Sequence, residues 1–288
     1  MSRRGLILFL LAGLFWGLPY FFIAIALEHF STPTIVFART LIGALVLIPY
    51  AIKTGAVKKA IKAWPYVVLF GVLEMVGPWF LITEAEKHIS SGLAGLLIST
   101  VPFFAVAILA VVFKDRTALR PTPLSGMVIG FVGVFALVGI DSILGHVEPL
   151  WIGAVVLAAV GYAIAPIMAN HKMKDVPTAG VIGLSMGLVA LIYSIPASFN
   201  IPAELAASPP VDGWIALLVL GLVCSALAFV VFFNLIKEVG PVKASLITYV
   251  NTAVALLLGT IFLAEPVTPG LLIGIPLITV GLYLSAKK

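Results

Sequence analysis

The chain is built from long, continuous apolar runs separated by short polar links, with no alternation of apolar and polar positions along a run. A helix that crosses the roughly 30 Å hydrocarbon layer needs about 20 apolar residues, whereas the strands of a membrane β-barrel alternate. The pattern therefore predicts an all-α integral membrane protein with ten transmembrane helices. The ten runs cover residues 5–27, 33–52, 64–83, 91–113, 121–140, 149–170, 178–198, 212–236, 242–263 and 267–286.

The composition agrees with a protein that lies in a lipid bilayer. Hydrophobic residues make up 62% of the 288 residues, charged residues only 10%, and the mean hydropathy is +1.21. A soluble domain normally has about 25% charged residues, because its surface must be hydrated. The composition excludes a secreted disulfide scaffold, a disordered chain and a nucleic-acid-binding domain, so we expect no nucleic-acid partner. The single cysteine, Cys224, cannot form an intramolecular disulfide.

The basic residues predict the orientation, because Lys and Arg are enriched in short cytoplasmic segments of membrane proteins. With the N-terminus inside, 15 of the 17 basic residues fall in cytoplasmic segments, while Lys87 is outside and Arg39 lies within a span. An odd number of spans would put Lys287 and Lys288 on the wrong side of the membrane. We therefore expect a multi-pass protein with both termini in the cytoplasm.

The second half of the chain repeats the first. At an offset of 150 residues, the match runs without gaps over residues 64–115 and places Trp64 on Trp214. We therefore expect two five-helix repeats, residues 1–144 and 145–288. Because five is an odd number, the two repeats must cross the membrane in opposite directions.

The charges of corresponding loops support this inversion. The loop at 53–63 has four lysines and no acid, whereas its counterpart near 199–213 has Glu204 and Asp212 and no base. Loops on opposite sides of a membrane are expected to differ in this way. Inverted repeats are typical of secondary transporters, which bind substrate near the midplane of the bilayer and expose it to each side in turn. The repeat therefore predicts a transporter.

The chain resembles the drug/metabolite transporter superfamily, and within it the ten-helix EamA-type exporters. The resemblance covers nearly the whole chain and includes the repeat itself. Its residues are Trp16-Gly17, Arg39, Gly92–Asp115 with the mid-helix Pro102, and Pro266–Gly274. The chain looks most like the bacterial exporters of aromatic and other neutral amino acids. It departs from the common pattern where Tyr162-Ala163 replaces a Trp-Ala pair and where Thr252 stands opposite Pro102.

The resemblance implies a fold, a location and a direction. It implies a central cavity lined mainly by helices 1, 3, 4, 6, 8 and 9, with helix 2 more a scaffold than a lining element. It also implies a bacterial-type inner membrane and export of substrate, since nothing in the residues themselves gives a direction of transport.

Glu74 is the first candidate for a functional residue, because it lies about ten residues from each end of the third apolar run. An ionisable group near the bilayer centre costs at least about 2.5 kcal/mol and is a functional candidate by default. Glu74 either binds a substrate amine or carries a proton, or it is a neutral glutamic acid hydrogen-bonded to a neighbouring helix.

Aromatic and amide side chains well inside the expected lining helices are the other candidates for substrate binding. Together with Glu74 they are Trp16, Tyr20, Trp79, Tyr162, Tyr249 and Asn251. Proline inside a helix frees a backbone carbonyl, which in lipid must find another partner or line a cavity. We therefore expect helix bends or gating positions at Pro19, Pro78, Pro102 and Pro166.

Two further features favour structural roles. Arg39 lies near the outer end of its helix, so it is expected either to reach the interface or to form an ion pair with Glu28 or Glu84. Glycine ladders permit close approach of helices, within one chain or between two copies of a homodimer. The ladders are Gly126/Gly130/Gly133 and Gly270/Gly274.

The sequence lacks the residue patterns of metal sites and of common catalytic sites. The four histidines lie at span ends or in loops, without metal-ligand spacing, and there is no phosphate-binding loop or nucleophile elbow. We therefore expect no cofactor, no metal and no enzymatic activity, and a small molecule as the partner. The preferred interpretation is an exporter of amino acids or similar small metabolites. A multidrug or purine/nucleoside exporter of the same fold is the alternative, and a membrane-embedded enzyme is a remote third.

Overall fold

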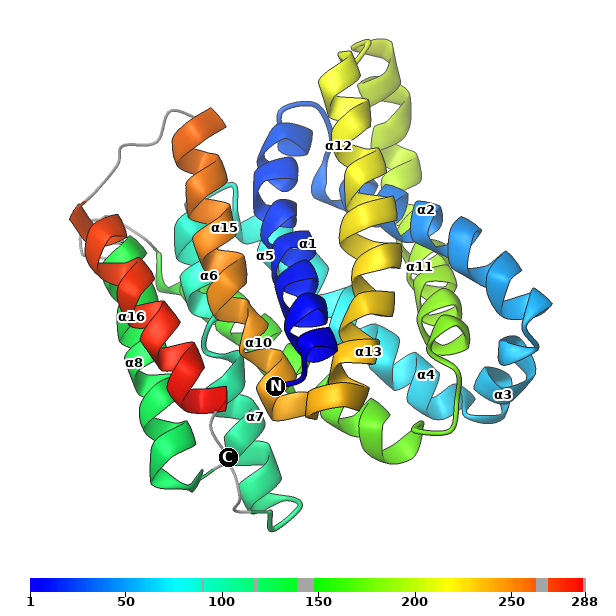
Figure 1. Ribbon diagram of the computed structural model, residues 1–288. Helices are drawn as coiled ribbons and strands as arrows, with labels where there is room; N and C mark the ends of the chain where they lie inside the picture. Colours follow the sequence, from blue (N-terminus) through cyan, green and yellow to red (C-terminus); the bar gives the residue numbers. More distant parts are fainter. Residues whose placement is uncertain (90, 116–118, 139–147, 263–268, 287–288) are drawn as a thin grey trace.

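The computed structural model describes residues 1–89, 91–115, 119–138, 148–262 and 269–286, and these are almost entirely helical (Figure 1). Two of the helical segments, η1 and η3, are π-helical. In chain order the elements are α1 (Arg3–Leu27), α2 (Thr32–Lys53), α3 (Ala56–Lys62), α4 (Trp64–Gly71), η1 (Val72–Val76), α5 (Gly77–Ala85), α6 (Ser91–Ile98), α7 (Val101–Val111), α8 (Pro121–Val138), α10 (Pro149–Lys172), α11 (Thr178–Ala206), α12 (Val211–Gly221), η3 (Leu222–Leu227), α13 (Ala228–Val239), α14 (Pro241–Ser245), α15 (Ile247–Phe262) and α16 (Pro269–Ala286).

The all-helical membrane architecture is confirmed. Within the described residues, eight stretches are long and apolar enough to cross a bilayer, and each coincides with a predicted span. The two remaining predicted spans are occupied by α8 and α16, which have 18 residues each. Residues 139–140 and 267–268 of those two predictions lie outside the described residues. Figure 1 shows the start of α1 and the end of α16 on the same side of the molecule.

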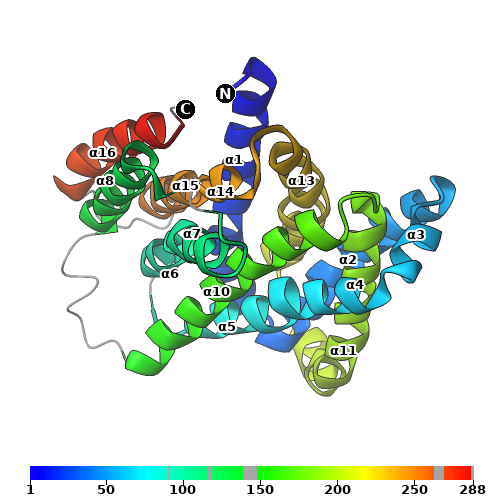
Figure 2. The ribbon, with the colours of Figure 1, turned by 90° about the horizontal axis from the view of Figure 1, so that it is seen from below.

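The helix contacts follow the symmetry expected of two repeats. The first helix of the first repeat, α1, packs against α12, α13 and α15 of the second repeat. Its counterpart in the second repeat, α10, packs against α4, α5, α6 and α7 of the first. Corresponding helices also pair directly, as α2 with α11 and α8 with α16, while the two halves of the fourth span, α6 and α7, pack crosswise against α15 and α14 of the ninth. Figure 2 shows the α8–α16 pair at one edge of the molecule and α11 at the opposite edge. A two-fold relation between the repeats produces this exchange of partners.

The glycine ladder on α8 packs helices within this chain. A Cβ atom on Gly133 would lie 2.7 Å from the backbone nitrogen of Ile278 and 2.9 Å from the carbonyl oxygen of Gly274, both on α16. Only glycine lets two backbones approach so closely, and the gain is van der Waals contact along the pair.

Two elements differ from the sequence prediction. The seventh helix continues to Ala206 instead of ending near residue 198, because Glu204 Oε1 accepts a hydrogen bond from the Ser31 backbone nitrogen at 2.7 Å and fixes the end of α11. The lysine-rich link at 53–63 contains the short helix α3. Residues 199–206 and the link at 53–63 contain polar or charged residues, so the apolar pattern did not assign them to helices although their backbones are helical.

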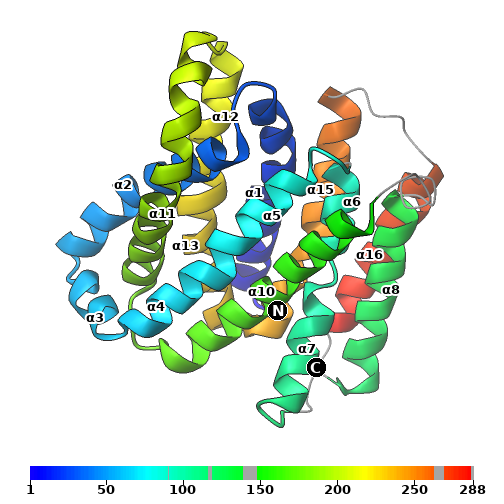
Figure 3. The same cartoon turned by 180° about the vertical axis from the view of Figure 1, so that it is seen from behind.

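Each repeat interrupts its third span at the same position. The π-helical segment η1 begins at Val72 and η3 begins at Leu222, so the two starts are separated by the same 150 residues as the sequence match. A π-helical turn inserts one extra residue and leaves a carbonyl without its usual α-helical partner, and such turns are frequent at functional sites. Figure 3 shows α4 and α5, on either side of η1, running beside α10.

Candidate functional site

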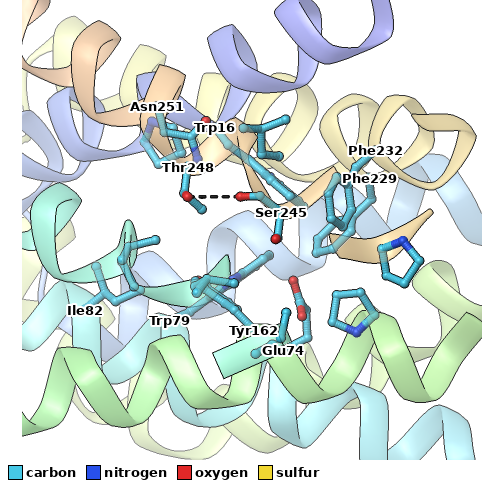
Figure 4. Close-up of a pocket in the computed structure, with 18 of the residues that line it drawn as sticks. Trp16, Glu74, Trp79, Ile82, Tyr162, Phe229, Phe232, Ser245, Thr248 and Asn251 are labelled. Carbon is cyan, nitrogen blue, oxygen red and sulfur yellow. Dashed lines mark hydrogen bonds between the residues drawn. The ribbon is translucent and has the colours of Figure 1, made fainter. Parts of the chain in front are cut away.

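A cavity lies between the two repeats and contains about 860 Å³ of empty space, part of it open to solvent. Its wall comes from α1, α2, η1, α5, α6, α7, α10, α13, α14 and α15. These elements include all six of the helices that the family resemblance implied. Figure 4 shows aromatic rings, Glu74 and a small group of polar side chains directed into this space.

Trp16 is fixed against the second repeat. Its indole Nε1 donates a hydrogen bond to the carbonyl oxygen of Cys224 at 3.0 Å, within the π-helical segment η3. The ring packs edge-on against Phe229, with centroids 5.1 Å apart, and against Phe232, with centroids 4.5 Å apart. This hydrogen bond joins α1 to the π-helical segment of the second repeat, and together with the ring contacts it holds an aromatic wall in place.

Glu74 belongs to the other π-helical segment. It lines the cavity, its side chain is only 3% exposed, and no described residue forms a hydrogen bond with its shielded Oε2 atom. The backbone around it is held from outside: the hydroxyl of Tyr193 donates to the carbonyl of Val76 at 2.7 Å. On α10, Gly161 lets the helix rest against the carbonyl of Leu73. The carboxyl group therefore sits in a rigid, closely packed position with an unfilled hydrogen-bonding capacity.

Arg39 corrects two expectations. None of the ion pairs among the described residues includes Arg39, because Glu84 instead pairs with Lys87 at 2.8 Å and accepts a hydrogen bond from Thr32. Arg39 also reaches the cavity wall from α2, a helix expected to be mainly scaffold. The reason is geometric, since α2 packs along η3 and α12 and so turns this residue inward.

Ser225 and Trp79 determine where the guanidinium group of Arg39 lies. Its Nε donates to the hydroxyl oxygen of Ser225 at 3.2 Å, and Ser225 in turn donates to the carbonyl of Leu220 at 2.7 Å. The guanidinium carbon lies 3.6 Å from the centroid of the Trp79 ring, a cation–π contact. The two π-helical segments thus place a carboxyl group and, through Ser225, a guanidinium group at the wall of one cavity.

Glu86 is an acidic residue that the sequence reasoning did not single out. It follows the last residue of the third span, and both of its carboxyl oxygens are shielded without a hydrogen bond to any described residue. Burial raises the pKa of Glu86 well above its usual range, and the charge of Arg39 opposes this shift. Only the folded chain reveals that these oxygens are shielded, because a position at a span end suggests exposure.

Most of the predicted binding residues meet at the cavity. Its lining includes Trp16, Tyr20, Glu74, Trp79, Tyr162 and Asn251. Tyr249 does not line it: the side chain is fully buried, and its hydroxyl donates to the carbonyl of Met127 on α8 at 2.8 Å. On α15, Asn251 faces the cavity whereas Tyr249 faces α8. The depth of a residue in its span does not predict which of these directions its side chain takes. The lining also contains Phe229, Phe232, Ser245 and Thr248, which sequence reasoning did not identify.

The four prolines fall into two groups. Pro19 and Pro166 line the cavity inside the continuous helices α1 and α10. Pro78 and Pro102 lie at the starts of α5 and α7, where the third and fourth spans are interrupted. All four therefore occur at the cavity or at helix breaks. In the part of the chain that the structure describes, no group of three or more His, Cys, Asp or Glu side chains is arranged to hold a metal ion.

Comparison with known proteins shows the same architecture. A model of the EamA-like transporter family matches the chain twice, over residues 3–139 and 149–287. A solved crystal structure with 22% sequence identity superposes with a TM-score of 0.77 and covers 99% of this chain and 98% of its own. That likeness establishes the fold.

Several curated proteins are similar over nearly their whole length. The "Uncharacterized inner membrane transporter YedA" of Escherichia coli is 27% identical over 283 residues, covering 95% of this chain and 90% of its own. The "Probable terminal-alkyne amino-acid exporter" of Streptantibioticus cattleyicolor is 24% identical, with the same coverage. The "Uncharacterized transporter YoaV" of Bacillus subtilis is 25% identical and covers 94% of this chain and 93% of its own.

Proposed function

Because the chain belongs to the EamA-like transporter family, we propose that it is a secondary transporter that exports amino acids or similar small metabolites through its central cavity. The resemblance to exporters of aromatic and neutral amino acids supports this substrate class. So does the similarity to a protein named as an amino-acid exporter.

The observation that carries the proposal is the chemistry of the cavity wall. Trp16, Trp79 and Tyr162 supply flat apolar surfaces, and Glu74 supplies a carboxyl group without a protein partner on its shielded oxygen. An aromatic amino acid presents the complementary groups, a ring and an ammonium group. We assign Glu74 to the substrate amine and the aromatic residues to the side chain of the substrate.

Transport then proceeds by rocking one repeat against the other around the fixed site. The contacts between repeats are exchanged symmetrically, so the same interfaces can close on either side of the cavity. The prolines at the cavity and at the helix breaks provide positions where backbone hydrogen bonds are already missing, and bending there costs less than elsewhere. We place both termini in the cytoplasm, as the distribution of basic residues indicates.

Counterflow in proteoliposomes tests the proposal. Vesicles loaded with unlabelled phenylalanine, a purine nucleoside or a cationic drug are each assayed for uptake of the corresponding labelled compound. We expect exchange of phenylalanine and of other neutral amino acids. Exchange of nucleosides or drugs without amino acids would overturn the substrate assignment in favour of the alternative exporter. Absence of all exchange together with lipid hydrolysis or group transfer would overturn transport itself.

A further inference from the structure

Arg39 is a buried cation that forms no ion pair with any residue the structure describes, and the charge of Glu86 acts on it only from beyond 4.0 Å. Its side chain is 4% exposed, it lies within the membrane-spanning helix α2, and no acidic side chain of the described residues lies within 4.0 Å of its guanidinium nitrogens. A charged group at this depth is costly, and its presence is by default a sign of function. The question is therefore what stabilises this charge while the protein works.

The protein contacts of Arg39 use only part of its capacity. The hydroxyl oxygen of Ser225 accepts the hydrogen bond from Nε–H, and Trp79 covers one face of the guanidinium plane. A guanidinium group has five N–H donors in a planar fork, so four remain on the two terminal nitrogens. No described residue accepts a hydrogen bond from either of these nitrogens, although Arg39 lines the cavity. The contacts present the fork in a fixed orientation, which is the arrangement that binds a carboxylate in a bidentate manner.

The cavity holds an opposite charge as well. Glu74 lines the same space, and Tyr162 lies within electrostatic range of both Glu74 and Arg39. A wall with one free guanidinium group and one carboxyl group complements a molecule that carries both an anionic and a cationic group. A cationic drug would satisfy only Glu74, an organic acid only Arg39, and a neutral nucleoside neither.

We propose that Arg39 binds the carboxylate of a zwitterionic amino acid, at the opposite end of the substrate's polar head from the ammonium group that Glu74 binds. This inference rests on the proposed function and sharpens it, because it makes a free α-carboxylate a requirement for binding. Arg39 is thereby a specificity-determining residue, and amides, amines and nucleosides are rejected because they leave its two terminal nitrogens unpaired in a buried site.

The test measures binding of three related ligands to the purified protein by calorimetry. Phenylalanine has both charged groups, phenylalaninamide lacks the carboxylate, and 3-phenylpropionate lacks the ammonium group. In the wild type, loss of the carboxylate is expected to weaken binding about 10–100-fold, the range for a charged hydrogen bond. In Arg39→Gln, phenylalanine should lose its advantage over the amide, while affinity for the amide itself should not fall, because the guanidinium nitrogens that it left unpaired are gone.

Two further variants separate recognition from structure. Arg39→Lys keeps the charge but lacks the planar fork, so it should weaken phenylalanine binding less than Arg39→Gln does, and it should not weaken binding of the amide. It also serves as the decisive variant if Arg39→Gln does not fold. Lys87→Gln is the matched control, because it removes a positive charge that pairs with Glu84 outside the cavity lining. Its affinities should equal those of the wild type.

The outcomes distinguish this inference from the proposed function. The wild type could exchange and bind phenylalanine while both Arg39 variants keep the wild-type ratio of affinities for phenylalanine and its amide. Arg39 would then not bind the carboxylate, and this inference would fail while the proposed function stands. Equal weakening of all three ligands would assign Arg39 a purely structural role and would also overturn the inference. If the wild type neither binds nor exchanges any amino acid, the proposed function fails and this inference fails with it.

Discussion

Gly161 is the position where the packing around Glu74 makes the sharpest prediction. It lies on α10 opposite the π-helical segment η1. A Cβ atom at this position would come nearer than 3.0 Å to the backbone carbonyl of Leu73 and to within 3.2 Å of Pro78. The first neighbour is backbone and cannot rotate away, so Gly161→Ala forces α10 and η1 apart. Reaching the ordinary contact distance of 3.4 Å requires a displacement of at least 0.4 Å.

Gly153 provides a matched control on the same helix. A Cβ atom there would meet nothing within 4 Å. Both substitutions exchange glycine for alanine in α10, so the gain in helix propensity, about 0.5–1 kcal/mol, cancels between them. The difference between the two variants is then the cost of overpacking, about 1–3 kcal/mol. Gly153→Ala should be as stable as the wild type or slightly more stable, and Gly161→Ala should be less stable by that difference.

The assay combines stability with transport. Unfolding of both variants in detergent is followed by fluorescence, and phenylalanine counterflow is measured in proteoliposomes. Because Glu74 lies one residue from Leu73, displacement of η1 should also lower the exchange rate of Gly161→Ala, whereas Gly153→Ala should exchange like the wild type. Equal stability and equal exchange in the two variants would show that α10 does not constrain η1, and the structural account of the Glu74 site would be wrong.

Three other substitutions follow from the same structure. Glu74→Gln should reduce phenylalanine exchange at least about tenfold, the effect of losing one charged hydrogen bond, without loss of thermal stability; unchanged exchange at every pH removes Glu74 from the mechanism. Trp16→Phe should destabilise the protein by about 0.5–1.5 kcal/mol, because the carbonyl of Cys224 loses its donor; a neutral result in a chemical unfolding curve contradicts this. Gly133→Leu should separate α16 from α8 and lower the melting temperature, while the exposed Val132→Leu should not.

The positions of the helices could be predicted almost completely from the sequence. An apolar run of about 20 residues in lipid has no alternative to a helix, since every backbone polar group must be satisfied within the segment. The repeat offset of 150 residues then indicated the symmetry that pairs α2 with α11 and α8 with α16. The end of α11 was missed because a hydrogen bond from Ser31 to Glu204 holds it, and Ser31 is distant in the sequence.

The candidate site was predictable only in part. Polar and aromatic residues deep in apolar runs, such as Glu74 and Trp16, stand out because lipid penalises them. Tyr249 has the same signal but packs against α8, because the direction of a side chain depends on which helix lies beside it. At the offset of 150 residues, Cys224 corresponds to Glu74. The repeat therefore also pairs the segment that forms η3 with the segment that forms η1.

The sequence alone determined that this chain is a ten-run, twice-repeated membrane protein, because burial in lipid and charge asymmetry are local properties of a segment. Only the tertiary structure decided which of its few charges are neutralised. Arg39 looked like half of an ion pair with Glu28 or Glu84, and the folded chain gives it Ser225, Trp79 and an open cavity instead. The partner of a buried charge is set by distances between helices that are far apart in the chain, and a linear pattern does not contain those distances.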